Sequence, residues 1–164
     1  MRRFITCLWL ILIPVSAQAN SLQTLLPNAE VRGAATFRFI GFPLYKARLF
    51  TKSGAPLDWN ADFALELQYQ RNLTQYDLVE GTMRELARLG PALPVRDQLN
   101  TCFKNVRKGD RYLAVSRGQN RVAFWLNGTP TCTLSHPKIK ARFMGIFLGN
   151  NTRSKSFTRK LKGE

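Results

Sequence analysis

The sequence predicts an α+β fold, in which a long, largely antiparallel sheet carries helices packed on one of its faces. Apolar and polar residues alternate in several short segments, as they do in strands that bury one face. Residues typical of tight turns separate neighbouring strand segments. The helical segments fall into two groups, one after the first strands and one near the end of the chain. This segregation of strands from helices is typical of the α+β class.

The first strands are expected within residues 36–50, on either side of a turn at residues 41–43. Phe37 and Phe39 share one face of the first strand, and Arg38 belongs to the other face. A loop at residues 52–60, which contains glycine and proline, leads to the next strand.

A third strand is expected at residues 63–69, where apolar residues alternate with Glu and Gln. Thr74 is a candidate N-cap for the helix that follows, since Asp77 stands three residues later. Gly90 and Pro91 end this helix. A second helix is expected at residues 94–106.

The rest of the chain is expected to form a strand meander and then further helices. Strands at residues 110–117 and 121–127 make a hairpin, and a short strand follows at residues 131–134. A third helix is expected from residue 135 to residue 147, and a short basic helix at residues 154–162.

The N-terminal segment has the layout of a cleavable secretory signal. Arg2 and Arg3 precede an apolar run at residues 4–15, and small residues surround the expected cleavage between Ala19 and Asn20. The run of about 12 residues is short of the roughly 20 that a membrane-spanning helix needs, which disfavours the alternative of a permanent anchor. We therefore expect a signal peptide at 1–19 and a single domain at 20–164, in the periplasm.

Removal of the signal leaves two cysteines, Cys102 and Cys132. An oxidising compartment allows them to form a disulfide, and the alternative is two separately buried thiols. Because His136 is the only histidine, neither a zinc site nor a cysteine nucleophile with a histidine base is expected.

The chain is strongly basic, with a formal net charge of +15. Such a charge attracts polyanions, and for an exported protein an anionic membrane surface is a more fitting partner than nucleic acid. The alternative is a solvated basic surface without a specific partner. The excess is densest in the final quarter, at Lys138, Lys140, Arg142, Arg153, Lys155, Arg159, Lys160 and Lys162.

Local catalytic signatures are missing from the sequence. It has no Gly-rich phosphate loop before a helix and no nucleophile elbow. Asp and Glu total only 10, and no pair of them falls in an obvious cleft-forming segment. Catalysis by paired carboxylates is disfavoured, and no cofactor or metal is expected.

Several segments, in this order and spacing, resemble the bacterial chalcone isomerase-like proteins. They are GAATFRFIGFPLYKARLF at 33–50, LTQY at 73–76, VRKGDR at 106–111, FWLNG at 124–128 and FMGIFLG at 143–149. The resemblance covers almost all of the chain after the signal. It implies an open-faced β-sandwich, in which a cleft lies between the antiparallel sheet and the helices packed on it.

The resemblance also implies site residues. Arg38 matches an arginine that reaches into the cleft in the isomerases and in fatty-acid-binding members, where a guanidinium can hold a carboxylate or phenolate. Tyr76 is the nearest match to a tyrosine at the start of the first helix. Lys46 stands where isomerases have a threonine, and Thr82 or Met83 where they have an asparagine, so ring closure is doubtful. The alternatives are that Arg38 and Lys46 are surface residues and that Tyr76 is a core residue.

Three functions follow from these observations. The first is a non-catalytic protein that binds a small anionic amphiphile, such as a fatty acid or an aromatic acid, through an apolar cleft with Arg38, Tyr76 and Lys46 at the headgroup. The second is an intramolecular lyase of the chalcone isomerase type. The third is a basic envelope protein that docks on anionic lipid without a pocket ligand.

Overall fold

A computed structural model describes residues 18–164, with side chains from Leu22 onward, so nearly all of the predicted signal at 1–19 lies outside the described residues. Six strands form one sheet in the order β1-β2-β3-β4-β5-β6, and every neighbouring pair is antiparallel. The strands are β1 (Ala29–Phe39), β2 (Phe42–Lys52), β3 (Ala64–Tyr69), β4 (Arg111–Ser116), β5 (Arg121–Leu126) and β6 (Thr129–Ser135).

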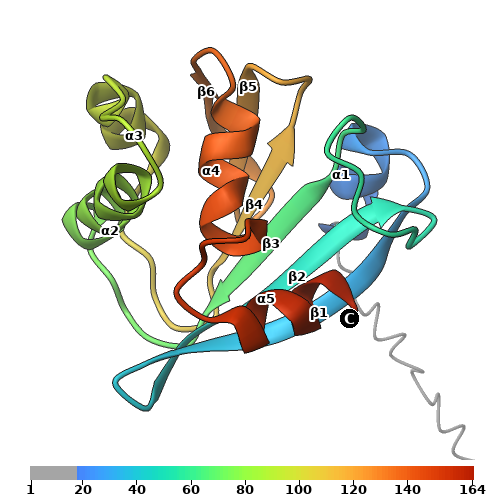
Figure 1. Cartoon of the computed structure of the whole chain (residues 1–164), viewed down its shortest axis with the longest axis horizontal. Coiled ribbons are helices and arrows are strands. Elements are labelled where there is room, and N and C mark those ends of the chain that lie inside the picture. Colours follow the sequence, from blue (N-terminus) through green and yellow to red (C-terminus); the bar gives the residue numbers. More distant parts are fainter. Residues whose placement is uncertain (1–17) are drawn as a thin grey trace, which may run out of the picture.

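Helices cover the two faces of the sheet unequally (Figure 1). The inner face carries α2 (Gln75–Arg88), α3 (Arg96–Cys102), α4 (Ile139–Leu148) and α5 (Lys155–Lys162). The short α1 (Gln18–Leu25) packs on the outer face, where Leu22 and Leu25 contact a small cluster that contains Phe50 and Val115. The α+β class is confirmed, and the helix on the outer face is an addition to the prediction.

The main core lies between the inner face of the sheet and the four helices. Alternate residues of the strands supply it, including Leu49, Leu65, Tyr112 and Phe124, and most residues of α4 are buried. This alternation follows from the two-residue period of a strand, which sends successive side chains to opposite faces. The helices therefore pack on the side chains that point from the inner face of the sheet.

Element bounds differ from the prediction at several places. β6 is longer than expected at both ends and includes Ser135, so the helix predicted from residue 135 begins only at Ile139. β1 begins at Ala29, earlier than expected, and pairs with β2 along its whole length. The turn between them centres on Ile40 and Gly41 instead of residues 41–43. α3 ends at Cys102, because Phe103 is extended and Val106 exchanges backbone hydrogen bonds with Leu73. Tertiary pairing has overridden the helical pattern of the sequence here.

A disulfide joins Cys102, at the end of α3, to Cys132 on the edge strand β6, with 4.9 Å between the two Cα atoms. Gln98 on the same helix reinforces the attachment, since its side chain donates to the Ser135 carbonyl at 3.1 Å and accepts from the Ser135 N–H at 2.8 Å. α3 is therefore fixed covalently and by hydrogen bonds to the sheet.

α5 packs tightly on β1 at Gly33. A Cβ atom at Gly33 would lie 2.5 Å from the carbonyl oxygens of Lys160 and Leu161, so only glycine fits this close approach. Arg32 also donates to the Lys162 carbonyl at 2.8 Å. The C-terminal helix is thereby held across the first strand, where it closes one side of the sheet's inner face.

Within residues 18–164, no helix combines the length and apolar character needed to cross a membrane.

Candidate functional site

A cavity of about 630 Å³ lies between the inner face of the sheet and α2, α4 and α5. Its volume falls inside the roughly 300–1,000 Å³ typical of small-ligand sites. Most of its wall is aromatic or aliphatic, contributed by Phe37, Leu65, Leu67, Phe124, Phe143 and Phe147. The closely packed core thus leaves one large apolar hollow, and its shape suits the tail of an amphiphile.

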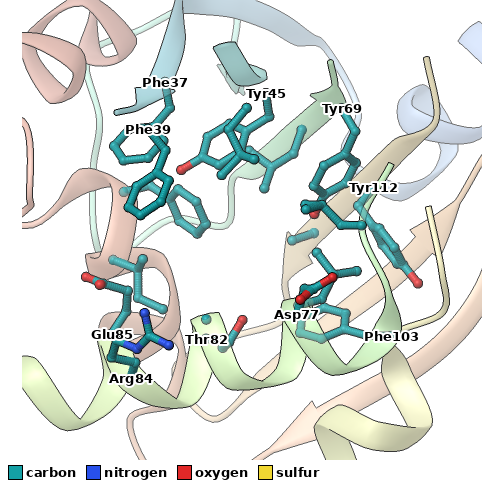
Figure 2. A pocket seen from close by; sticks show the side chains of 18 of the residues that line it. Phe37, Phe39, Tyr45, Tyr69, Asp77, Thr82, Arg84, Glu85, Phe103 and Tyr112 are labelled. Atoms are coloured by element: carbon teal, nitrogen blue, oxygen red, sulfur yellow. The ribbon is translucent and has the colours of Figure 1, made fainter. Parts of the chain in front are cut away.

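Three tyrosines line the sheet side of this cavity, and because the Tyr112 hydroxyl donates to the Cys102 carbonyl at 3.2 Å, Tyr45 and Tyr69 are the two that concern a ligand. Tyr45 stacks on Phe37 with 5.2 Å between ring centroids, and Tyr69 lies edge-on to Tyr45 at 6.3 Å (Figure 2). Neither hydroxyl makes a hydrogen bond to another residue of the described chain, although Tyr69 is only 5% exposed. Desolvation by burial raises the pKa of both phenols well above its ordinary value, so both stay neutral and can donate to a ligand.

The opposite wall is α2, which begins as the sequence predicts. Thr74 is the N-cap, and its side chain accepts from the Asp77 N–H at 3.1 Å while the Asp77 carboxylate accepts from the Thr74 N–H at 2.8 Å. The Thr74 hydroxyl also donates to the Asp77 carboxylate at 2.7 Å, and this bond, together with that from the Thr74 N–H, lowers the pKa of Asp77. This capping box fixes the start of the helix and hence its cavity-lining face, which carries Gly81, Thr82 and Arg84.

Gly81 leaves space open in the middle of α2. A Cβ atom there would meet no other atom within 4 Å. Glycine in a helix interior is less stable than alanine by roughly 0.5–1 kcal/mol, so helix formation does not explain this residue. Its missing side chain enlarges the hollow between Tyr45 and Tyr69 on the sheet and Thr82 on the helix (Figure 2).

Charged side chains gather along the α2 side of the cavity, and the carboxylates among them are already engaged. Glu80 pairs with Arg96, and this hydrogen-bonded contact lowers the pKa of Glu80. Glu85 pairs with both Arg88 and Arg153.

Arg84 makes no salt bridge within the described chain, and Figure 2 shows its guanidinium beside the open space. The same cavity wall includes Arg71, which also forms no salt bridge among residues 18–164, although its charge helps to lower the pKa of Asp77, as the charge of Arg84 does for Glu80. Two cationic groups are thus available to an anionic headgroup.

The structure does not bring Arg38, Tyr76 and Lys46 together. Phe37 and Phe39 face the cavity, so Arg38 lies on the outer face, where it is exposed and donates to the Gly41 carbonyl at 3.3 Å. Lys46 is also exposed on that face. The expectation that these two cations point into the cleft was wrong, because the aromatic side chains occupy the face that the helices cover.

Tyr76 lines the cavity but is 72% exposed, so it is not the core residue that the helical pattern also allowed. Thr82, noted in the sequence as a departure from the isomerases, lies in the cavity wall, whereas Met83 packs against the main core. The residues that sequence reasoning missed are Tyr45, Tyr69 and Arg84. A signal was present for the tyrosines, since they continue the apolar face of β2 and β3.

Part of the basic C-terminal quarter serves the fold. Lys140 is fully buried, donates to the Ala61 carbonyl at 2.7 Å, and has a pKa lowered by desolvation. Arg142 donates to the carbonyls of Leu86 and Pro91 at 2.9 and 2.7 Å. These cations fasten α4 to its surroundings and are not free for an outside partner.

A second hollow of about 330 Å³ lies on the outer face beneath α1. Arg48 and Arg111 both donate to one oxygen of Glu66 there, at 2.6 and 3.1 Å. Because each guanidinium already has a carboxylate partner, this hollow offers a weaker anion site than the larger cavity. Among the described residues, no group of three or more His, Cys, Asp or Glu side chains could hold a metal ion.

This architecture, an antiparallel sheet with a cavity beneath its helices, is the chalcone isomerase-like fold. Among solved structures, the chain is similar to a fatty-acid-binding protein of Arabidopsis thaliana, with a TM-score of 0.66 and 8% identity over 84% of this chain and 88% of that one. At this identity the likeness defines the fold. No family model and no curated protein sequence matches the chain.

Proposed function

We propose that the protein binds a small anionic amphiphile, with its apolar tail in the large cavity and its anionic head near Arg84. The observation that carries the proposal is the apolar hollow of about 630 Å³ between sheet and helices. The fold shared with a fatty-acid-binding protein supports the choice of ligand class. The anionic head is placed at Arg84, which lines the cavity, and not at Arg38, as the sequence suggested.

Burial of the apolar tail should supply most of the binding free energy, and a polar contact at the head should add to it. Each buried methylene contributes about 0.8 kcal/mol, so each should tighten binding about fourfold until the cavity is full. Association itself costs at least about 4 kcal/mol, which a short tail barely offsets. A charge-assisted hydrogen bond from Arg84, worth roughly 1.5–3 kcal/mol, then decides whether a carboxylate is preferred to an alcohol.

Isothermal titration calorimetry with saturated fatty acids of increasing length tests the proposal. Affinity should rise with each methylene and then level off. Arg84→Gln should weaken binding about tenfold or more, whereas Arg38→Gln, a matched loss of one charge on the other face, should leave it unchanged. If none of the acids binds, the proposal is wrong; if Arg38→Gln alone weakens binding, the headgroup has been misplaced.

We also propose that the protein is exported to the periplasm. The signal-like pattern of residues 1–19 supports this, and a disulfide between Cys102 and Cys132 suits an oxidising compartment. Intact-mass measurement of the protein recovered from cells tests it. A chain that begins at Asn20 is the expected product, and an unprocessed N-terminus in the cytosolic fraction would contradict export.

The lyase alternative is not proposed. It depended on an arginine at position 38 reaching the substrate, and that side chain lies on the face away from the cavity.

A further inference from the structure

The turn between β1 and β2 carries an unusual concentration of exposed apolar side chains. Phe39 is 46% exposed, Ile40 79% and Phe42 68%. The hairpin extends away from the body of the molecule (lower left in Figure 1), so this turn is well placed to contact a partner. We call Phe39, Ile40 and Phe42 the apolar tip.

The backbone conformation at the tip disfavours the residue that the sequence has at position 40, so folding does not explain its presence. Ile40 has a φ angle of 49°, in the left-handed region, and Gly41 follows at 80°. Two consecutive positive φ angles define the hairpin turn that favours Asn-Gly, and a β-branched residue is strongly disfavoured at the first position. Asparagine at position 40 would serve both turn formation and solubility better. A partner that accepts apolar groups explains the isoleucine.

Cations flank the apolar tip. Arg38 and Lys46 are exposed on the outer face of β1 and β2, a few residues before and after the turn. Neither forms a salt bridge within the described part of the chain, so both are available to anionic groups. Apolar side chains beside Lys and Arg are the combination that holds peripheral proteins at an anionic membrane interface.

The tip also borders the cavity. Phe39 belongs to the tip and to the cavity wall at once, and Tyr76, 72% exposed, lines the same cavity from α2. Four of the five large apolar side chains exposed in the described structure therefore lie at the tip or at the cavity, Val31 being the fifth. If the tip contacts a surface that carries amphiphiles, those molecules lie next to the cavity wall.

We propose that the apolar tip docks on an anionic phospholipid bilayer. Phe39, Ile40 and Phe42 enter the interfacial layer, and Arg38 and Lys46 contact lipid phosphates. Docking then brings the part of the cavity wall at Phe39 to the membrane surface, where amphiphiles are concentrated. This purpose rests on the proposed function, but the docking contact itself does not require an occupied cavity.

Co-sedimentation with vesicles of phosphatidylglycerol and phosphatidylcholine tests the proposal. The processed protein should sediment with these vesicles, less with phosphatidylcholine alone, and less as salt rises. Arg38→Gln and Lys46→Gln should each weaken binding about fivefold. The double variant Ile40→Asn, Phe42→Ser should weaken it at least tenfold. Val31→Asn, which removes an exposed apolar side chain distant from the tip in β1, is the matched control and should bind as the unmodified protein does.

Several outcomes would overturn the docking proposal. They are absence of vesicle binding, binding by the double variant that is as tight as that of the unmodified protein, and a loss of binding in Val31→Asn as large as that in the double variant. Self-association that Ile40→Asn abolishes, without vesicle binding, would show that a second copy covers the tip. Ile40→Asn alone should keep or raise the melting temperature, so unfolding would not explain a loss. Gly81→Trp, which fills the cavity, should still bind vesicles, and this separates failure of docking from failure of amphiphile binding.

Discussion

Filling the cavity from Gly81 is the sharpest perturbation that the structure offers. A Cβ atom at this position meets nothing within 4 Å, so a larger side chain can project into the hollow without a backbone shift. Gly81→Ala should stabilise the helix by up to about 1 kcal/mol and raise the melting temperature by about 2–4 °C, while leaving the cavity open. It is therefore the matched control for larger substitutions.

Gly81→Trp should abolish most of the amphiphile binding. If the indole displaces about four methylenes of the bound tail, the loss is about 3 kcal/mol, or more than a hundredfold in affinity. Calorimetric titration with dodecanoate measures it, and circular dichroism checks that the variant is folded. Ala87→Trp places the same ring on the exposed side of α2 and should bind normally. A folded Gly81→Trp that binds as tightly as Gly81→Ala would refute the placement of the ligand.

Three further predictions concern stability. Replacing Cys102 and Cys132 by serine, which opens a sequence separation of 30, should cost roughly 3–4 kcal/mol in guanidinium unfolding; a loss below about 1 kcal/mol would contradict it. Gly33→Ala should cost about 1–3 kcal/mol and expose α5 to proteolysis, because its Cβ would lie 2.5 Å from two carbonyl oxygens of that helix; an unchanged protease pattern would argue against this packing. The raised pKa of Tyr45 and Tyr69 keeps the folded state protonated above pH 10, where the unfolded chain ionises, so stability is full below pH 10 and falls above it. Tyr45→Phe or Tyr69→Phe should each reduce that slope by about 1.4 kcal/mol per pH unit, and an unaltered slope would mean that the phenol is solvated.

The sequence predicted elements whose signals are local. The alternation at residues 63–69 correctly marked Leu65, Leu67 and Tyr69 as one face of a strand, and the spacing of Thr74 and Asp77 correctly placed the start of α2. These succeed because strand period and helix capping depend on neighbouring residues alone.

The site could not be predicted in the same way. Alternation separates Arg38 from Phe37 but does not say which face the helices cover, and that choice depends on neighbouring strands and on the packing of α5. The cavity depends on what distant elements leave unfilled, including the missing side chain at Gly81. The helix α1 on the outer face lacked a clear pattern and was not expected. The face of β1 that the helices cover, the cavity and the position of α1 all depend on the tertiary arrangement.

Native mass spectrometry of the gently purified protein tests the central claim most directly. The account predicts that one small amphiphile per chain is carried from the cells or taken up from added dodecanoate, and that Gly81→Trp carries none. A bare mass for the unmodified protein, both before and after incubation with the acid, would contradict it.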